Sequence, residues 1–315
     1  MAGHHPAVWL GFTGMIIVLL IIDLGVLNRR SHVLTTREAA RWSAGLVLLA
    51  GLFAVWLWDR EGQHAALEFV TGYLIELSLS VDNLFVFILV FQYFAVPAKL
   101  QPKVLKWGIF GALIMRAIMI AFGALLLNRF HWIIYVFGAI LVVTGLNMFR
   151  GTAAHRVEPE KNPLVRLARR VLPFSDSYDG DKFTTRTRTK RLATPLLLVL
   201  LVVEWTDLVF AIDSIPAIFA VTRDPFIVYS SNVFAILGLR ALFFLLAGML
   251  DRFFYLQAGV GLILTFVGAK MVLSGVVHLP TALSLGVIIG ILAVAILASI
   301  ARGRREQLGE SPPAD

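Results

Sequence analysis

The sequence predicts an all-α fold, a polytopic membrane helix bundle, and three observations lead to it. Hydrophobic residues make up 58% of the 315 residues, and the mean hydropathy is +0.82. Charged residues make up only 15%, whereas a soluble domain carries about 25%. Apolar runs of the length that crosses a bilayer, about 20 residues in a helix, recur along the chain.

We predict nine transmembrane helices, with the N-terminus outside and the C-terminus in the cytoplasm. The predicted spans are residues 7–27, 42–58, 70–95, 107–127, 132–150, 194–220, 227–250, 254–276 and 281–301. With this topology the inner loops hold 22 of the 28 Lys and Arg residues, and the outer loops hold three. The positive-inside rule expects this asymmetry. We therefore expect a multi-pass protein of the cell inner membrane.

The domain organisation follows from the polar segments. Residues 1–315 are expected to form a single integral membrane transporter domain. A cytoplasmic loop is predicted at about 151–193, and a disordered C-terminal tail at about 303–315. Within the loop, residues 163–173 place apolar residues at helical spacing with basic residues on the other side. Either an interfacial helix on anionic lipid or a solvated linker fits this pattern.

Spans three to five resemble spans six to eight. Residues 76–83 read ELSLSVDN, and residues 207–214 read DLVFAIDS. The match continues through Arg116 with Arg240. It then runs at equal spacing through Arg129 with Arg252, Gly138 with Gly261, and Gly145 with Gly268. Because span three enters the membrane from outside and span six from inside, the copies form an inverted 3+3 repeat, which is typical of secondary transporters. The alternative is a duplication retained for folding alone.

Six carboxylates lie within the predicted spans, where each costs roughly 2.5–3.5 kcal/mol at a helix centre. They are Asp23, Glu76, Asp82, Glu204, Asp207 and Asp213. The intramembrane bases Arg116, Arg240 and Lys270 can neutralise at most three of them. If all of these groups ionise, three negative charges remain, and a bound divalent cation together with a proton would neutralise them. Two alternatives are that some acids are protonated, or that acids and bases pair to hold the bundle together.

From these residues we predict a metal site. Its expected ligands are Glu76, Asp82, Asn83, Glu204, Asp207 and Asp213. The expected supporting or gating residues are Asp23, Ser214, Arg116, Arg240, Asn232 and Lys270. Carboxylate, amide and hydroxyl oxygens suit manganese, calcium or magnesium. The chain has no Cys, which excludes thiolate ligands.

Helix geometry adds a condition to this prediction. Residues six apart on a straight helix point about 120° apart. Asp207 and Asp213 would therefore converge on one ion only if their helix is interrupted. Pro216 favours an interruption, because proline removes a backbone hydrogen bond.

These motifs resemble the signature of the TerC family. The resemblance rests on residues 76–83, on EWTDLVFAIDSIPAIFAV at 204–221 and on NVFAILGLRA at 232–241, and it covers about 7–301. The chain looks closest to the Alx-type members. The resemblance implies a nine-span inner-membrane protein related to the LysE superfamily of exporters. It also implies links to manganese export, to metalation of secreted enzymes and to tellurite resistance.

The resemblance carries the family's acidic positions over to Glu76, Asp82, Glu204, Asp207 and Asp213 of this chain. The leading hypothesis is a manganese exporter, with Mn²⁺ as the transported or bound ion and Ca²⁺ or Mg²⁺ as alternatives. The second is a metal-binding membrane scaffold that supports metalation of secreted proteins or tellurite resistance. Neither is an enzyme, since no nucleophile–base pair or nucleotide loop is present. The expected partners are the metal ion, the lipid bilayer and proteins of secretion, without nucleic acid.

Overall fold

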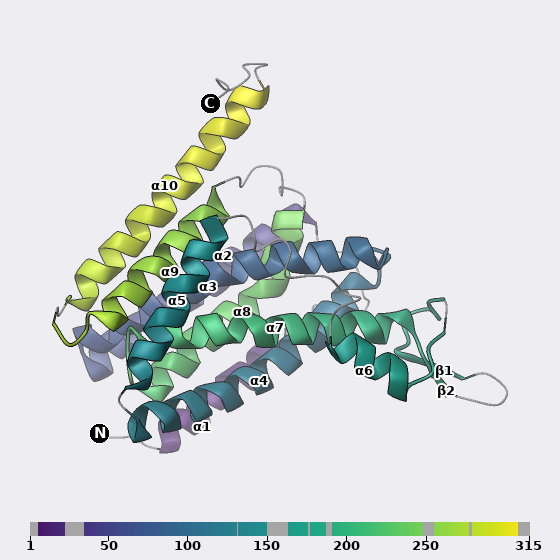
Figure 1. The fold of residues 1–315 in the computed structure, drawn as a ribbon, viewed down its shortest axis with the longest axis horizontal. Helices are drawn as coiled ribbons and strands as arrows, with labels where there is room; N and C mark the ends of the chain where they lie inside the picture. Colours follow the sequence, from purple (N-terminus) through teal and green to yellow (C-terminus); the bar gives the residue numbers. More distant parts are fainter. Residues whose placement is uncertain are drawn as a thin grey trace.

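The computed structural model describes residues 6–22, 35–130, 132–149, 163–175, 177–186, 191–247, 255–276 and 279–307 (Figure 1). The helices are α1 (Pro6–Ile21), α2 (Thr36–Glu61), α3 (Gln63–Tyr93), α4 (Gln101–Arg129), α5 (Ile133–Phe149), α6 (Pro163–Val171), α7 (Pro195–Phe219), α8 (Pro225–Ala247), α9 (Leu256–Val272) and α10 (Thr281–Gln307). The strands β1 (Thr184–Arg186) and β2 (Arg191–Ala193) pair in an antiparallel hairpin.

A helix lies at each predicted span, and six of these helices are long and apolar enough to cross a membrane. The six are α2, α3, α4, α7, α8 and α10, whereas α1, α5 and α9 are shorter apolar helices. Large apolar side chains remain exposed on the outer helices, among them Leu52 at 58%, Ile114 at 62% and Leu125 at 68%. Lipid is the solvent that such a surface fits. The chain is thus a multi-pass integral membrane protein.

The central helices of the bundle are α3 and α8, which pack against each other. α3 also contacts α2, α7 and α10, and α4 lies across α7 and α8. α5 packs along α9, and α10 lies beside α9 at the edge of the bundle (Figure 1). Phe69 of α3 and Phe234 of α8 meet edge to face in the largest core cluster. This arrangement buries the segments that carry the predicted acids.

Only Gly62 separates α2 from α3. Its φ of +92° lies in the left-handed region, where a glycine is least strained. α2 begins with a capping box in which Thr35 and Glu38 satisfy each other's backbone N–H groups. α2 therefore extends beyond its predicted span at both ends. α3 begins before its predicted span, although it ends at Tyr93, and Glu68 lies inside it.

The expected interruption near Pro216 is not present. α7 is helical from Pro195 to Phe219, and α3 is also continuous through residues 76–83. Pro216 lies in the last turn of α7, and its neighbours Ile215 and Ala217 are buried at 3% and 0% exposed. Packing on both sides holds the turn in helical form although one hydrogen bond is lost. The prediction of a broken helix was wrong.

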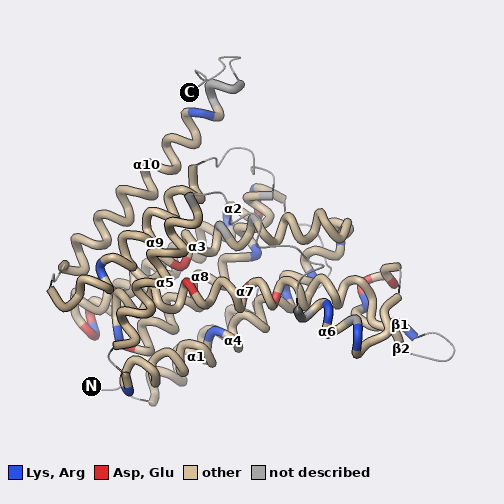
Figure 2. Tube along the Cα trace, viewed as in Figure 1, with Lys and Arg blue, Asp and Glu red and all other residues tan. Residues whose placement is uncertain are grey.

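The described part of the long loop is folded against the ends of α3 and α4. The Tyr178 hydroxyl donates to the Phe94 carbonyl at 2.8 Å, and Lys103 Nζ donates to Asp181 Oδ2 at 3.1 Å. Lys103 also lies 5.0 Å from the ring centroid of Phe183. Basic residues gather at this end of the molecule, around α6 and the hairpin (Figure 2). Residues 151–162 of the loop and 308–315 of the tail lie outside the described residues.

Candidate ion-binding site

A buried polar cluster lies where α3, α4, α7 and α8 meet, and Arg116 of α4 is at its centre. The Arg116 side chain is 1% exposed. Its Nη1 donates to Glu76 Oε1 on α3, and its Nη2 donates to Asp207 Oδ1 on α7 at 3.3 Å. Glu76 and Asp207 are themselves 0% and 2% exposed. One guanidinium therefore bridges two carboxylates from helices that are far apart in the sequence.

Two neutral oxygens complete this cluster. Arg116 Nη1 donates to Asn232 Oδ1 at 2.7 Å and to Ser214 Oγ at 3.2 Å. The Asn232 amide nitrogen donates in turn to Glu76 Oε2 at 3.3 Å. Among the described residues, Asp207 Oδ2 has no hydrogen-bond partner. The positive charge of Arg116 thus faces two carboxylate oxygens, one amide oxygen and one hydroxyl oxygen.

Asp213 does not join this cluster. Its Oδ1 accepts a hydrogen bond from Thr144 Oγ1 of α5 at 2.9 Å, and the residue is 8% exposed. The unbroken helix explains the separation, because Asp207 and Asp213 point in directions about 120° apart. The two aspartates of this motif therefore face different helices.

Glu204 and Arg240 lie beside the cluster. The Glu204 carboxylate packs against Gly111 of α4, where an added Cβ would collide with it. Asp207 and Arg240 both line a small cavity enclosed by α3, α4, α7 and α8. Its volume is about 10 Å³, which is close to the smallest space that holds one water molecule. Arg240 is 3% exposed.

The remaining predicted residues are distributed as follows. Asn83 is buried in α3 at 2% exposed, and Lys270 Nζ donates to Ser284 Oγ of α10 at 3.0 Å, away from the cluster. Asp23 and the side chain of Asp82 lie outside the described residues. Within the described set, no three His, Asp or Glu side chains are grouped so that they could hold a metal ion. The described acids among the predicted ligands therefore lie near one another at separate positions, each with its own contacts.

The sequence did not point to two residues that contact predicted acids. Thr144 contacts Asp213, and Gly111 contacts Glu204. The only signal for Thr144 was a polar residue in an apolar span. A second polar group lies at the start of α3, where Glu68 accepts from Thr222 Oγ1 at 2.8 Å and pairs with His64 at 3.2 Å. Glu68 was missed because the predicted span began at residue 70.

Membrane-crossing helices around a buried charged cluster define a multi-pass integral membrane protein with an internal polar site. Residues 61–307 match the model of the integral membrane protein TerC family, and the chain belongs to this family.

An uncharacterized membrane protein of Myxococcus xanthus, STKORF319, is 50% identical over 299 residues, covering 95% of this chain and 93% of that protein. Alx of Escherichia coli (strain K12), provisionally named a membrane-bound redox modulator, is 48% identical over 303 residues, with 93% and 94% covered. The Alx protein of Salmonella typhi, which carries the same provisional name, is 46% identical over 301 residues, with 93% of each chain covered. No solved structure gives a significant match.

Proposed function

We propose that this protein transports a divalent metal cation and acts as a manganese exporter. One observation carries the proposal: four oxygens from α3, α7 and α8 converge on a single buried cationic position, now held by the Arg116 guanidinium. A site that stabilises a buried positive charge with oxygen atoms is chemically suited to a hard metal ion.

The donor set supports this class of ion. Glu76 and Asp207 supply carboxylates, Asn232 supplies an amide oxygen and Ser214 supplies a hydroxyl. Manganese, magnesium and calcium all prefer such ligands. The TerC resemblance favours manganese among them. The two charges of the ion would also match two carboxylates better than the single charge of Arg116.

The proposed ion competes with Arg116 for the same oxygens. In the structure the arginine is a tethered cation whose single charge is shared by Glu76 and Asp207. An entering metal ion would replace the guanidinium at these oxygens, and Arg116 would return when the ion leaves. During such an exchange a cation always faces the two buried carboxylates. Leaving both carboxylates buried without a cation would cost several kcal/mol.

The proposed inverted repeat supplies the machinery for alternating access. A two-fold axis that exchanges α3–α5 with α7–α9 requires every inter-copy contact to occur twice or to map onto itself. The packing of α3 on α8 has its counterpart in the packing of α4 on α7. A Cβ added at Gly138 would lie 2.9 Å from the Gly268 carbonyl, and one added at Gly268 would lie 2.7 Å from the Gly138 carbonyl.

A Cβ added at Gly145 of α5 would lie 2.5 Å from the Gly261 carbonyl of α9, so the first glycine of each copy meets the second glycine of the other. These contacts support the inverted 3+3 repeat. We propose with it nine transmembrane helices, an outside N-terminus and a cytoplasmic C-terminus in the inner membrane, on the strength of the unequal distribution of Lys and Arg between the loops. We also propose that this transporter has no enzymatic activity.

The test is manganese binding and flux with the purified protein. Wild type, Glu76→Gln and Asp207→Asn would be compared by equilibrium dialysis in detergent and by Mn²⁺ uptake into reconstituted vesicles. Glu68→Gln is the matched control, because it neutralises a carboxylate on α3 outside the cluster. We expect the two cluster variants to lose binding and flux while the control retains both. Unchanged binding in both cluster variants would reject the site.

A metal-binding scaffold is the second candidate, and the complete burial of Glu76 and Asn232 favours it. A scaffold would retain the ion and release it to a secreted protein. Flux without any partner protein supports the exporter, and bound metal without flux supports the scaffold. The redox role in the name of the Alx relatives would need another chemistry here, since these 315 residues include no Cys.

A further inference from the structure

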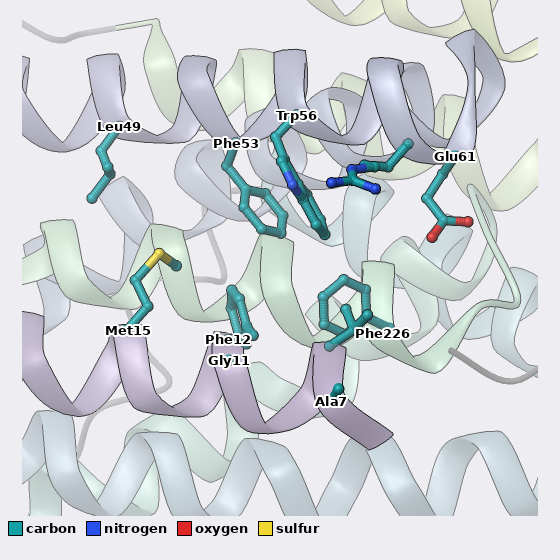
Figure 3. Close-up of a pocket in the computed structure, with 11 residues that line it drawn as sticks. Ala7, Gly11, Phe12, Met15, Leu49, Phe53, Trp56, Glu61 and Phe226 are labelled. Carbon is teal, nitrogen blue, oxygen red and sulfur yellow. The ribbon is translucent and has the colours of Figure 1, made fainter. Parts of the chain in front are cut away.

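An apolar groove lies between α1 and α2, with α8 behind it (Figure 3). Its volume is about 730 Å³, within the range of sites that bind small molecules, about 300–1,000 Å³. Phe12 of α1, Phe53 of α2 and Phe226 of α8 pack together at its base, with ring centroids 5.4–5.5 Å apart for the two pairs that involve Phe12. This aromatic contact makes the base of the groove a packed surface.

The lining of the groove is amphipathic along its length. Met15, Leu49 and Phe53 line it away from the end of α2, and Arg60 and Glu61 line it at that end. Glu61 extends into the space between the two helices (Figure 3). A ligand that fits this lining has a long apolar part and a polar part with both charges. Free ions and polar metabolites lack the apolar part.

We propose that this groove binds one zwitterionic phospholipid, with an acyl chain along the apolar lining and a phosphoethanolamine head group at Arg60 and Glu61. The guanidinium can donate two parallel hydrogen bonds to the phosphate. The carboxylate is placed to interact with the ammonium group. An anionic lipid such as phosphatidylglycerol lacks that ammonium and would bring its negative charge next to Glu61.

A substitution at Gly11 can close the groove directly. Gly11 lines it, and a Cβ added there would meet no atom within 4 Å. The variant Gly11→Leu should therefore fill the groove without disturbing the packing of α1. Gly14→Leu is the matched control, because Gly14 lies on the same helix, has the same free space and does not line the groove.

The experiment uses the full chain in mild detergent with a phosphatidylethanolamine probe that carries a photoreactive diazirine on one acyl chain. Mass spectrometry would locate and quantify the cross-links. We expect labelling of α1 and α2 in wild type and in Gly14→Leu, and a loss of about tenfold or more in Gly11→Leu. Equal labelling of Gly11→Leu and wild type would overturn the proposal.

A second arm tests the head group and the other occupants. With the same diazirine on phosphatidylglycerol, we expect weaker labelling of wild type, and Arg60→Gln should reduce labelling by the phosphatidylethanolamine probe. Equal labelling of wild type by the two probes would overturn the zwitterionic assignment. The groove could instead hold a second copy of this chain, and light scattering of each variant tests this. If Gly11→Leu converts an oligomer into a monomer, the groove holds that second copy, and the proposal is wrong.

Discussion

Arg116 and Glu76 form a buried ion pair between α4 and α3, and neither side chain is more than 1% exposed. The same guanidinium reaches Asp207 Oδ1 at 3.3 Å, so two carboxylates depend on one base. In a medium of low dielectric, removing that base leaves both acids uncompensated. Arg116 is therefore the residue on which the state of the proposed site depends most.

Replacement of Arg116 should destabilise the protein in a way that metal corrects. Breaking a buried ion pair costs about 3–5 kcal/mol, so we expect Arg116→Gln to unfold at a lower temperature in detergent. If a metal ion replaces the guanidinium, added Mn²⁺ should raise the unfolding temperature of Arg116→Gln more than that of wild type. The double variant Arg116→Gln with Glu76→Gln should recover part of the loss without metal. An equal response of Arg116→Gln and wild type to Mn²⁺ would contradict the exchange.

The contact between α5 and α9 should not tolerate a methyl group at its glycines. A Cβ at Gly138 would lie 2.9 Å from both the Gly268 carbonyl and Met271 Cβ, and both helices would have to move apart. We expect Gly138→Ala to cost about 1–3 kcal/mol in unfolding experiments. Gly286→Ala on α10 is the control, since a Cβ there meets nothing within 4 Å and should be neutral or slightly stabilising. A neutral Gly138→Ala would show that the helices are less closely packed.

Thr144 should hold Asp213 toward α5. Its hydroxyl donates at 2.9 Å to a carboxylate, a hydrogen bond worth about 1.5–3 kcal/mol. Thr144→Val keeps the shape but removes the donor, so we expect lower stability in detergent, whereas Thr144→Ser should restore most of it. If Thr144→Val and Thr144→Ser unfold at the same temperature, the hydroxyl does not stabilise the fold.

The folded loop should open in acid. The Thr185 hydroxyl at 2.7 Å, and after it the Lys182 ammonium at 3.2 Å, lower the pKa of Asp179 below its ordinary value. A lowered pKa in the folded state means that the stabilisation is present above the ordinary aspartate pKa, about 3.9, and is lost as the pH falls through the folded value.

Cleavage by pepsin at decreasing pH would detect this opening within residues 177–186. Thr185→Val removes the largest cause of the lowered pKa, so the onset of cleavage should move to higher pH in that variant. Identical onsets in Thr185→Val and wild type would contradict the role of this hydrogen bond.

Much of the fold could be predicted from the chain, because an apolar run in lipid has to satisfy its backbone polar groups internally and forms a helix. The predicted span at 194–220 and the observed α7 at Pro195–Phe219 agree almost residue for residue. The ends of helices that extend into polar segments of the chain were less predictable than the apolar spans. The extension of α3 back to Gln63, with Glu68 inside it, depends on Gly62 and on packing, which hydropathy does not report.

The sequence by itself determined the class of protein, the family and three of the acids that the structure buries, Glu76, Asp207 and Asp213, because composition and motif spacing are properties of the chain. Only the tertiary structure decided which acids meet: Glu76 and Asp207 converge on Arg116, whereas Asp213 lies against Thr144. The physical reason is that the direction of a side chain depends on its position around the helix axis. The residues that it contacts depend on how the helices pack. Neither is fixed until Pro216 is held within a continuous α7 and α4 is placed across α7 and α8.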